Sequence, residues 1–197
     1  MSNPGEPAMS DSFLTVRSDH ACFGCGHDNP IGLHLRFAPD GDGVKASFIP
    51  GPEHQGFLDV VLGGIISSVL DEAMAWAVAH AGVWAVTGEM HVRSRQPLKI
   101  GDLTSVVARV SGTWGRLVTA TAELRLGRDH ALIATGFATF VTVEADVEAV
   151  WRARYLRDPE AVPADPRVTP RNAAQTSVQR NCVAPPCDDA FVAEVDH

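Results

Sequence analysis

The chain has 197 residues, 45% of them hydrophobic, which is enough to bury the core of one domain. Its 16 basic and 24 acidic residues give a net charge of −8 without a basic cluster, so we expect no nucleic-acid partner. No apolar run reaches the roughly 18 residues of a membrane-spanning helix, so we expect no membrane association.

The N-terminal residues predict a cytoplasmic protein with a loose arm. Residues 1–12 are mostly Pro, Gly, Ser and Asp, and they lack the basic and apolar regions of a secretory signal. In a reducing compartment, the four cysteines are expected to be thiols or metal ligands and not disulfides.

Residues 13–145 have the pattern of one folded domain. A glycine-rich segment leads into a short alternating strand at Leu33, Leu35 and Phe37, and 45–49 predicts a second strand. An apolar helix then opens at Gly63-Gly64 and is expected to end near Gly82.

After the helix, the hydrophobic period changes from a helical one to two. Strands are predicted at 86–95, 103–110, 117–126 and 130–143, with turns at 111–115 and 127–129. Short loops require these strands to pair in antiparallel fashion. We therefore predict an α+β fold in which one long buried helix is wrapped by a curved antiparallel sheet.

The C-terminal part, 146–197, is predicted to lie outside this domain. Residues 146–155 favour one amphipathic helix. From Pro159 onward the chain holds 6 of its 13 prolines, which indicates an extended tail without a core of its own.

Two adjacent carboxylates, Asp71 and Glu72, lie in the middle of the apolar helix. Neighbours on a helix point about 100° apart, so one of the two must face packed side chains. A carboxylate is costly there unless something uses or satisfies it, which makes it a candidate site residue.

These motifs, in this order, resemble the hotdog-fold acyl-CoA thioesterases. The pair Gly63-Gly64 is followed after seven residues by Asp71, and Thr87-Gly88-Glu89-Met90 runs into Arg93-Ser94-Arg95-Gln96-Pro97. The opening CFGCGHDNPIGLHLRF is similar to a segment common in these proteins, and the likeness is strongest to the PaaI-like branch.

The resemblance implies hydrolysis of an acyl-CoA thioester. Asp71 would activate water or attack directly, the Gly63 N–H would polarise the carbonyl beside Gly64, and Thr87 would help hold the water. Leu62 replaces the histidine of the family's His-Gly-Gly motif. A homodimer or dimer of dimers, with the site at the subunit interface, is also implied.

Four further residues are candidates for substrate binding. The cations Arg93, Arg95 and Arg116 are suited to the phosphates of coenzyme A, and His54 precedes the helix. We expect no cofactor, since coenzyme A is part of the substrate.

Cys22 and Cys25 form a C-x-x-C pair flanked by His20 and His27, and Cys182 and Cys187 form a second pair. Four potential ligands invite a zinc interpretation, but one C-x-x-C pair is a weak signal. The surrounding glycines favour a turn that folds over the helix with small buried cysteines. We therefore predict no metal site.

Two other functions stay open. A hotdog enoyl-CoA hydratase or dehydratase would typically need a histidine in the groove, and Leu62 weakens that hypothesis. A non-catalytic protein that binds acyl-CoA would keep the same scaffold.

Overall fold

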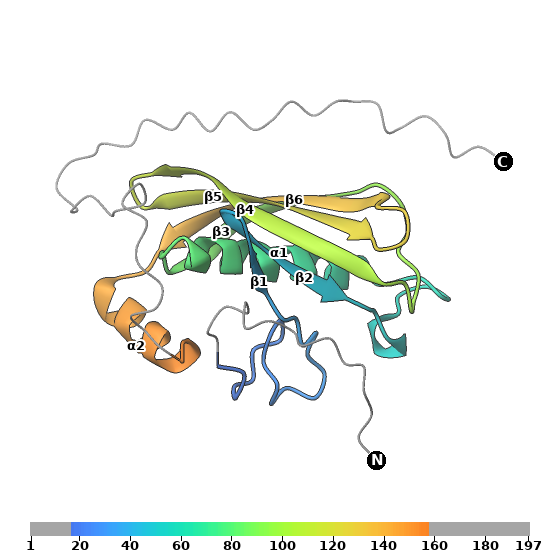
Figure 1. Cartoon of the computed structure of the whole chain (residues 1–197), viewed down its shortest axis with the longest axis horizontal. Coiled ribbons are helices and arrows are strands. Elements are labelled where there is room, and N and C mark those ends of the chain that lie inside the picture. The colour runs from blue at the N-terminus through green and yellow to red at the C-terminus, as the bar shows by residue number, and fades with distance from the viewer. Residues whose placement is uncertain (1–16, 158–197) are drawn as a thin grey trace, which may run out of the picture.

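The computed structural model describes residues 17–157, which form one six-stranded antiparallel sheet and two α-helices (Figure 1). The sheet order is β1-β2-β4-β5-β6-β3. The elements are β1 (Ala38–Asp40), β2 (Gly43–Phe48), α1 (Gly63–His80), β3 (Ala85–Ser94), β4 (Thr104–Trp114), β5 (Leu117–Leu126), β6 (Leu132–Thr142) and α2 (Ala145–Tyr155). A short 3-10 helix covers Pro52–His54.

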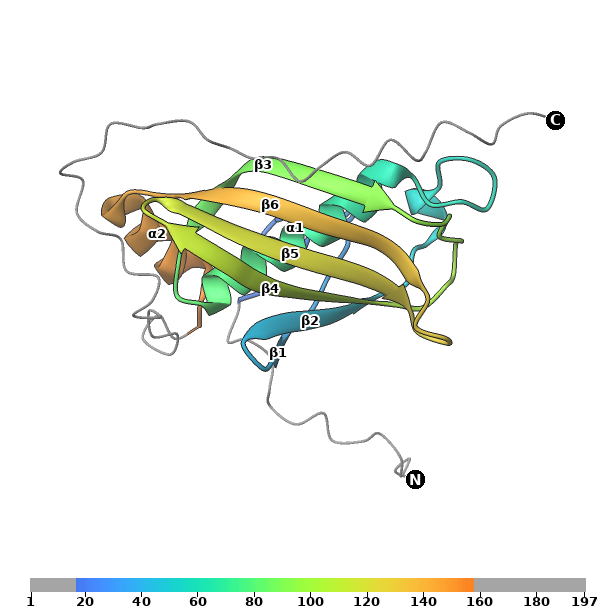
Figure 2. The ribbon, with the colours of Figure 1, turned by 90° about the horizontal axis from the view of Figure 1, so that it is seen from above.

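The sheet curves over α1, as Figure 2 shows from above. Along β5, buried Val118, Ala120 and Ala122 alternate with more exposed residues, so one face of the strand meets the helix. The helix contributes Leu70 and Met74, neither of which exposes any surface. The predicted α+β architecture of a long helix wrapped by a curved antiparallel sheet, the hotdog fold, is confirmed.

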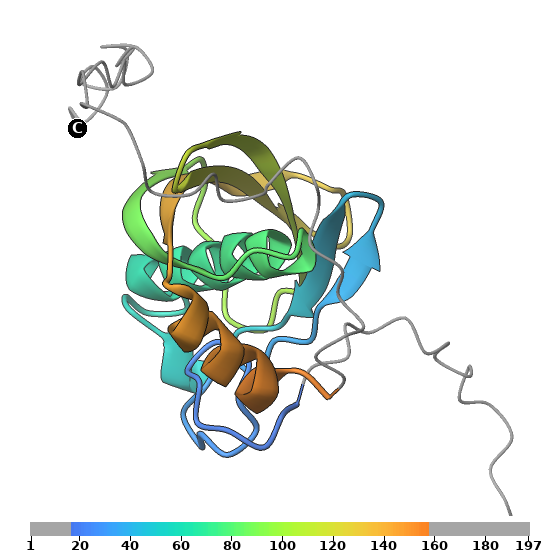
Figure 3. The ribbon, with the colours of Figure 1, turned by 90° about the vertical axis from the view of Figure 1, so that its left-hand side faces the viewer.

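The other side of α1 is covered by the N-terminal segment, residues 17–37, and by α2, which lie together below the helix in Figure 3. The backbone N–H of Arg17 donates to the carbonyl of Tyr155 at 2.7 Å. The ring of His20 meets Tyr155 edge-on, with centroids 4.9 Å apart. Chain segments more than a hundred residues apart are thus joined over one helix face.

The strand predicted at 33–37 is wrong. The alternating burial exists, since Leu33, Leu35 and Phe37 are buried, but β1 begins only at Ala38. The N–H groups of Leu33 and Leu35 bond instead to carbonyls of the 22–26 turn, and His34 has a φ of 52°. The alternation therefore reflects burial of these side chains and not a strand. Residues 33–37 pair with no strand in the described part of the chain.

The turn predicted at 111–115 is also wrong in extent. β4 continues to Trp114, with a register shift between Val110 and Gly112, and the chain reverses at Gly115, whose φ is 60°. A bulge lets polar residues continue a ladder that their composition alone does not predict.

No helix among residues 17–157 is long and apolar enough to span a membrane. The predicted arm at 1–12 and the Pro-rich extension after α2 lie outside the described residues.

Candidate functional site

A carboxylate and a hydroxyl meet at the edge of the sheet formed by β3. The Oγ1 of Thr87, on β3, donates a hydrogen bond to Oδ1 of Asp71, on α1, at 2.7 Å. Asp71 is half-buried and Thr87 is exposed, so water can reach the pair. A bulge at Gly88 directly follows Thr87 in the β3–β6 ladder. Two residues that were predicted to share a site are therefore in contact.

The first turn of α1 is open. Gly63 and Gly64 are exposed, and Leu62 at the N-cap makes no side-chain hydrogen bond to the turn. A Cβ built on Gly63 would meet no atom within 4 Å. The N–H groups of a first helical turn lack intrahelical acceptors and carry the positive end of the helix dipole. The N–H groups of this turn can therefore stabilise negative charge that develops on a bound group.

His54 lies under the entry to α1. Its side chain is buried, its Nδ1 accepts the Gly51 N–H at 3.0 Å, and its carbonyl accepts the Leu62 N–H at 2.9 Å. Its Nε2 is buried and has no partner among the described residues. These contacts are those of a residue that holds the helix start, and its predicted role in substrate binding stays a prediction.

The structure separates the three predicted phosphate ligands. Arg93 and Arg95 are exposed at the end of β3, where Arg93 pairs with Thr135. Arg116 lies at the other end of β6, bonding the Thr142 carbonyl and Glu144, each at 2.9 Å. Seven strand positions separate Thr135 from Thr142, about 23 Å. Arg116 is therefore not brought together with the other two.

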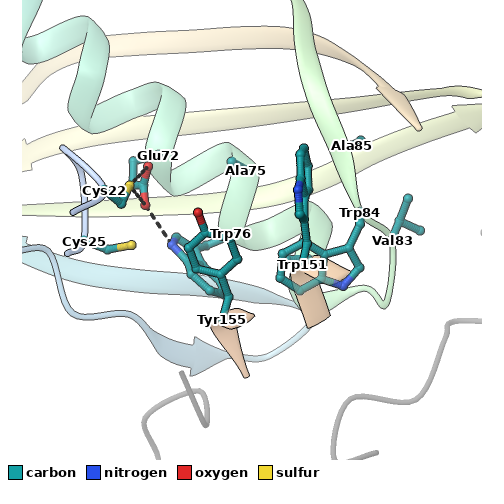
Figure 4. Close-up of a pocket in the computed structure, with 11 residues that line it drawn as sticks. Cys22, Cys25, Glu72, Ala75, Trp76, Val83, Trp84, Ala85, Trp151 and Tyr155 are labelled. Carbon is teal, nitrogen blue, oxygen red and sulfur yellow. Dashed lines mark hydrogen bonds between the residues drawn. The ribbon is translucent and has the colours of Figure 1, made fainter. Parts of the chain in front are cut away.

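The carboxylate that faces packed side chains is Glu72. It accepts a hydrogen bond from the Trp76 indole at 2.9 Å, and the Cys22 thiol lies 3.7 Å from each of its oxygens (Figure 4). Burial, and then the charge of Cys22, raise the pKa of Glu72 to about 7.

Glu72 lines a cavity of about 240 Å³ between α1, α2 and the N-terminal segment (Figure 4). Its walls include Cys22, Cys25, Trp84 and Tyr155. The sequence did not predict that Glu72 and the Cys22–Cys25 pair meet at one cavity. A signal was present, since Trp76 follows Glu72 by four residues and therefore shares its side of the helix.

A family model described as the thioesterase superfamily matches residues 58–133, which include α1, β3, β4 and β5. The predicted resemblance to the hotdog thioesterase superfamily is confirmed. No curated protein matches the sequence.

Solved structures of this superfamily share the fold at low identity. A thioesterase superfamily protein superposes with a TM-score of 0.56 at 20% identity, over 59% of this chain and 60% of that one. The PaaI protein of the Escherichia coli phenylacetic acid degradation operon gives 0.53 at 17%, over 57% and 81%. A Staphylococcus aureus acyl-CoA hydrolase mutant, in complex with coenzyme A, gives 0.51 at 24%, over 53% and 66%.

The chain thus spans less than two thirds of the first and third of these proteins. The match of residues 58–133 to the thioesterase superfamily model supports thioester hydrolysis in general terms.

Proposed function

We propose that the protein hydrolyses an acyl-CoA thioester, with Asp71 as the group that activates water. The observation that carries the proposal is the contact between Asp71 and Thr87 at a solvent-accessible edge of α1. A carboxylate held by one hydroxyl keeps its other oxygen available for a water molecule. The coenzyme A complex of the S. aureus hydrolase supports this class of substrate.

The chemical step consumes one water. Its oxygen bonds to the carbonyl carbon, its proton passes to Asp71, and the charge on the carbonyl oxygen grows. The N–H of Gly63 is suited to stabilise that oxygen, since it lies at a helix start that side chains leave open. The C–S bond then breaks, and the leaving thiolate takes up the proton. Direct attack by Asp71, which forms an anhydride, uses the same groups.

The distance between Gly63 and Asp71 favours a site that two subunits share. Gly63 and Asp71 are eight positions apart on α1, which is about 12 Å along the helix axis. An oxyanion and an attacking water must both lie about 3 Å from their partners. We therefore propose a homodimer, or a dimer of dimers, in which the helix start of one subunit approaches Asp71 and Thr87 of the other. The edge strand β3 is available for this contact.

Arg93 and Arg95 are proposed to bind the phosphates of coenzyme A. Arg93 is exposed on the same strand as Thr87, and Arg95, also exposed, directly follows the end of that strand. Guanidinium groups bind phosphate oxygens with two parallel hydrogen bonds. Arg116 already donates to acceptors on Thr142 and Glu144, so we propose that it contributes less to phosphate binding.

One observation favours a second candidate, an acyl-CoA binder without turnover. Leu62 replaces the family histidine at the helix start and makes no capping bond. A side chain that neither donates nor accepts cannot orient a thioester.

The deciding experiment replaces Asp71 by Asn. Against a panel of acyl-CoAs of varied length and aromaticity, we expect wild type to turn over at least one substrate. The D71N variant should lose at least about a hundredfold in kcat, because the water loses its base. Its melting temperature and its affinity for coenzyme A should be retained.

The matched control is D146N, at an exposed position in the first turn of α2. It should leave turnover unchanged. Equal kcat for D71N and wild type would refute the role of Asp71. Saturable binding without turnover in both proteins would favour the binder.

A further inference from the structure

Three side chains with metal-binding atoms meet on the face of α1 that is turned away from the sheet. Cys22 and Cys25 come from the N-terminal segment and Glu72 from the helix, and their ligand atoms all lie within 4.8 Å of one another. The proposed hydrolysis uses none of them, since Asp71 points toward β3 and not toward this cluster. Both cysteines are free thiols.

The spacing of the Cys22 and Glu72 ligand atoms fits a tetrahedral ion. In such a site, metal–sulfur bonds of about 2.3 Å and metal–oxygen bonds of about 2.0–2.2 Å place sulfur and oxygen ligands roughly 3.6 Å apart. The Cys22 sulfur lies 3.7 Å from each oxygen of Glu72. An ion can therefore bridge them with little movement of the chain.

The turn that carries the cysteines is shaped around Glu72. A Cβ on Gly24 would lie 2.3 Å from the Glu72 carboxyl carbon, and a Cβ on Gly26 would lie 2.5 Å from the backbone nitrogen of Cys22. Glycine at these two positions lets the turn close tightly on itself and on the helix. The cluster is thus a built feature of the fold.

A neighbouring side chain fixes the Glu72 carboxylate in place. The Trp76 indole holds one oxygen of Glu72 at 2.9 Å. Hydrogen bonds of this kind orient the ligands of protein metal sites.

We propose that Cys22, Cys25 and Glu72 bind one zinc-class divalent ion. Two thiolates select such an ion over magnesium or calcium. All three ligands line the cavity between α1 and α2, so the fourth coordination position opens into it and takes water or a small donor ligand. Binding releases the thiol protons and ties the N-terminal segment to α1.

The test uses the full chain, purified without a histidine tag under anaerobic, reducing conditions. Elemental analysis should find one zinc per chain. After chelation, titration with Co²⁺ should produce sulfur-to-cobalt charge-transfer absorption and the intense visible bands of a tetrahedral ion, saturating at one equivalent. This measurement on the wild-type chain does not depend on any variant folding.

Variants then locate the ion. C22S and C25S should each abolish the charge-transfer band or reduce it with a shift, and E72Q should weaken affinity for zinc at least tenfold. The matched control is the double variant C182S/C187S, which removes the other cysteine pair and should bind as wild type does. Circular dichroism checks that each variant is folded.

Three results would overturn the proposal. The first is no tetrahedral cobalt spectrum in the wild-type chain. The second is a spectrum lost in C182S/C187S but kept in C22S. The third is a Cys22–Cys25 disulfide, found by mass spectrometry in the anaerobically isolated chain, which would indicate a redox pair.

Discussion

Asp71 and Glu72 are neighbours in the sequence, yet they face different parts of the molecule. Asp71 contacts Thr87 at the sheet edge, and Glu72 contacts Cys22 and Trp76 beneath the N-terminal segment. The rotation of about 100° per residue separates them. The expectation that one carboxylate faces packed side chains is met by Glu72, while the family likeness pointed to Asp71.

Thr87 gives a test of the proposed water site at the scale of one hydroxyl. Thr87→Val keeps the shape of the side chain and removes the donor that holds Asp71. We expect kcat to fall roughly tenfold to a hundredfold, because the carboxylate loses its fixed position. Thr87→Ser retains the hydroxyl and should recover most of the activity. Similar kcat values for the Val and Ser variants would count against a positioning role.

His80, in the last turn of α1, should make stability depend on pH. Desolvation lowers its pKa from the ordinary 6.5, so the folded chain binds this proton less readily than the unfolded chain. His80 therefore does not change the free energy of unfolding above about pH 6.5. Below that value, the free energy of unfolding decreases as the pH falls.

Urea unfolding of H80Q between pH 5 and 8 measures this effect. The variant should lose less stability than wild type on acidification. The control H130N removes an exposed histidine at a φ of 56°, which Asn tolerates, and it should keep the wild-type profile. An identical acid-side loss in H80Q and wild type would exclude His80 as the source.

At the scale of elements, the contact between α1 and the sheet depends on a close approach at β6. A Cβ on Gly136 would lie 3.1 Å from the Met74 Cε and 3.3 Å from the Leu70 Cβ. The helix therefore packs directly on the strand backbone, which fixes the height of Asp71 above the sheet. Overpacking at this point forces strain into both elements.

Gly136→Val tests that packing. We expect the free energy of unfolding to fall by about 1–3 kcal/mol, since the rigid Leu70 Cβ cannot move away. Thr135→Val, on the half-exposed opposite face of the same strand, is the control and should change stability little. Chemical denaturation measures both. A G136V variant as stable as wild type would mean that α1 lies farther from β6.

At the scale of the whole molecule, the proposed reaction belongs to a pair of subunits. A two-fold dimer offers the same surface from both copies, so each site would take its Gly63 from one subunit and its Asp71 from the other. The exposed edge of β3 supports this arrangement, because an unpaired strand edge favours contact with a second chain.

Mixing two inactive variants tests the shared site. D71N lacks the base, and G63V blocks the approach to the helix start. In a mixed dimer, one site combines a wild-type Gly63 with a wild-type Asp71. Random co-assembly should therefore restore roughly a quarter of the wild-type activity. Sedimentation should show dimers, or dimers of dimers, in every sample. No recovery in confirmed mixed dimers would place both groups in one subunit.

The sequence by itself determined the fold class and most element positions. The strand predicted at 117–126 matches β5, and the helix at 146–155 differs from α2 by one residue. Local periodicity suffices there, since each strand or helix shows one face to the core. The family likeness, and not periodicity, predicted that Asp71 and Thr87 share one site.

The tertiary structure alone decided which residues from distant parts of the chain lie near Glu72. Cys22 lies fifty residues before it in the chain, and Tyr155 arrives from α2. The sequence around the C-x-x-C pair offers His20 and His27 as further ligands, and no local spacing predicts Glu72 on a distant helix. Such clusters arise from how segments pack across the fold, which depends on long-range contacts that periodicity does not contain.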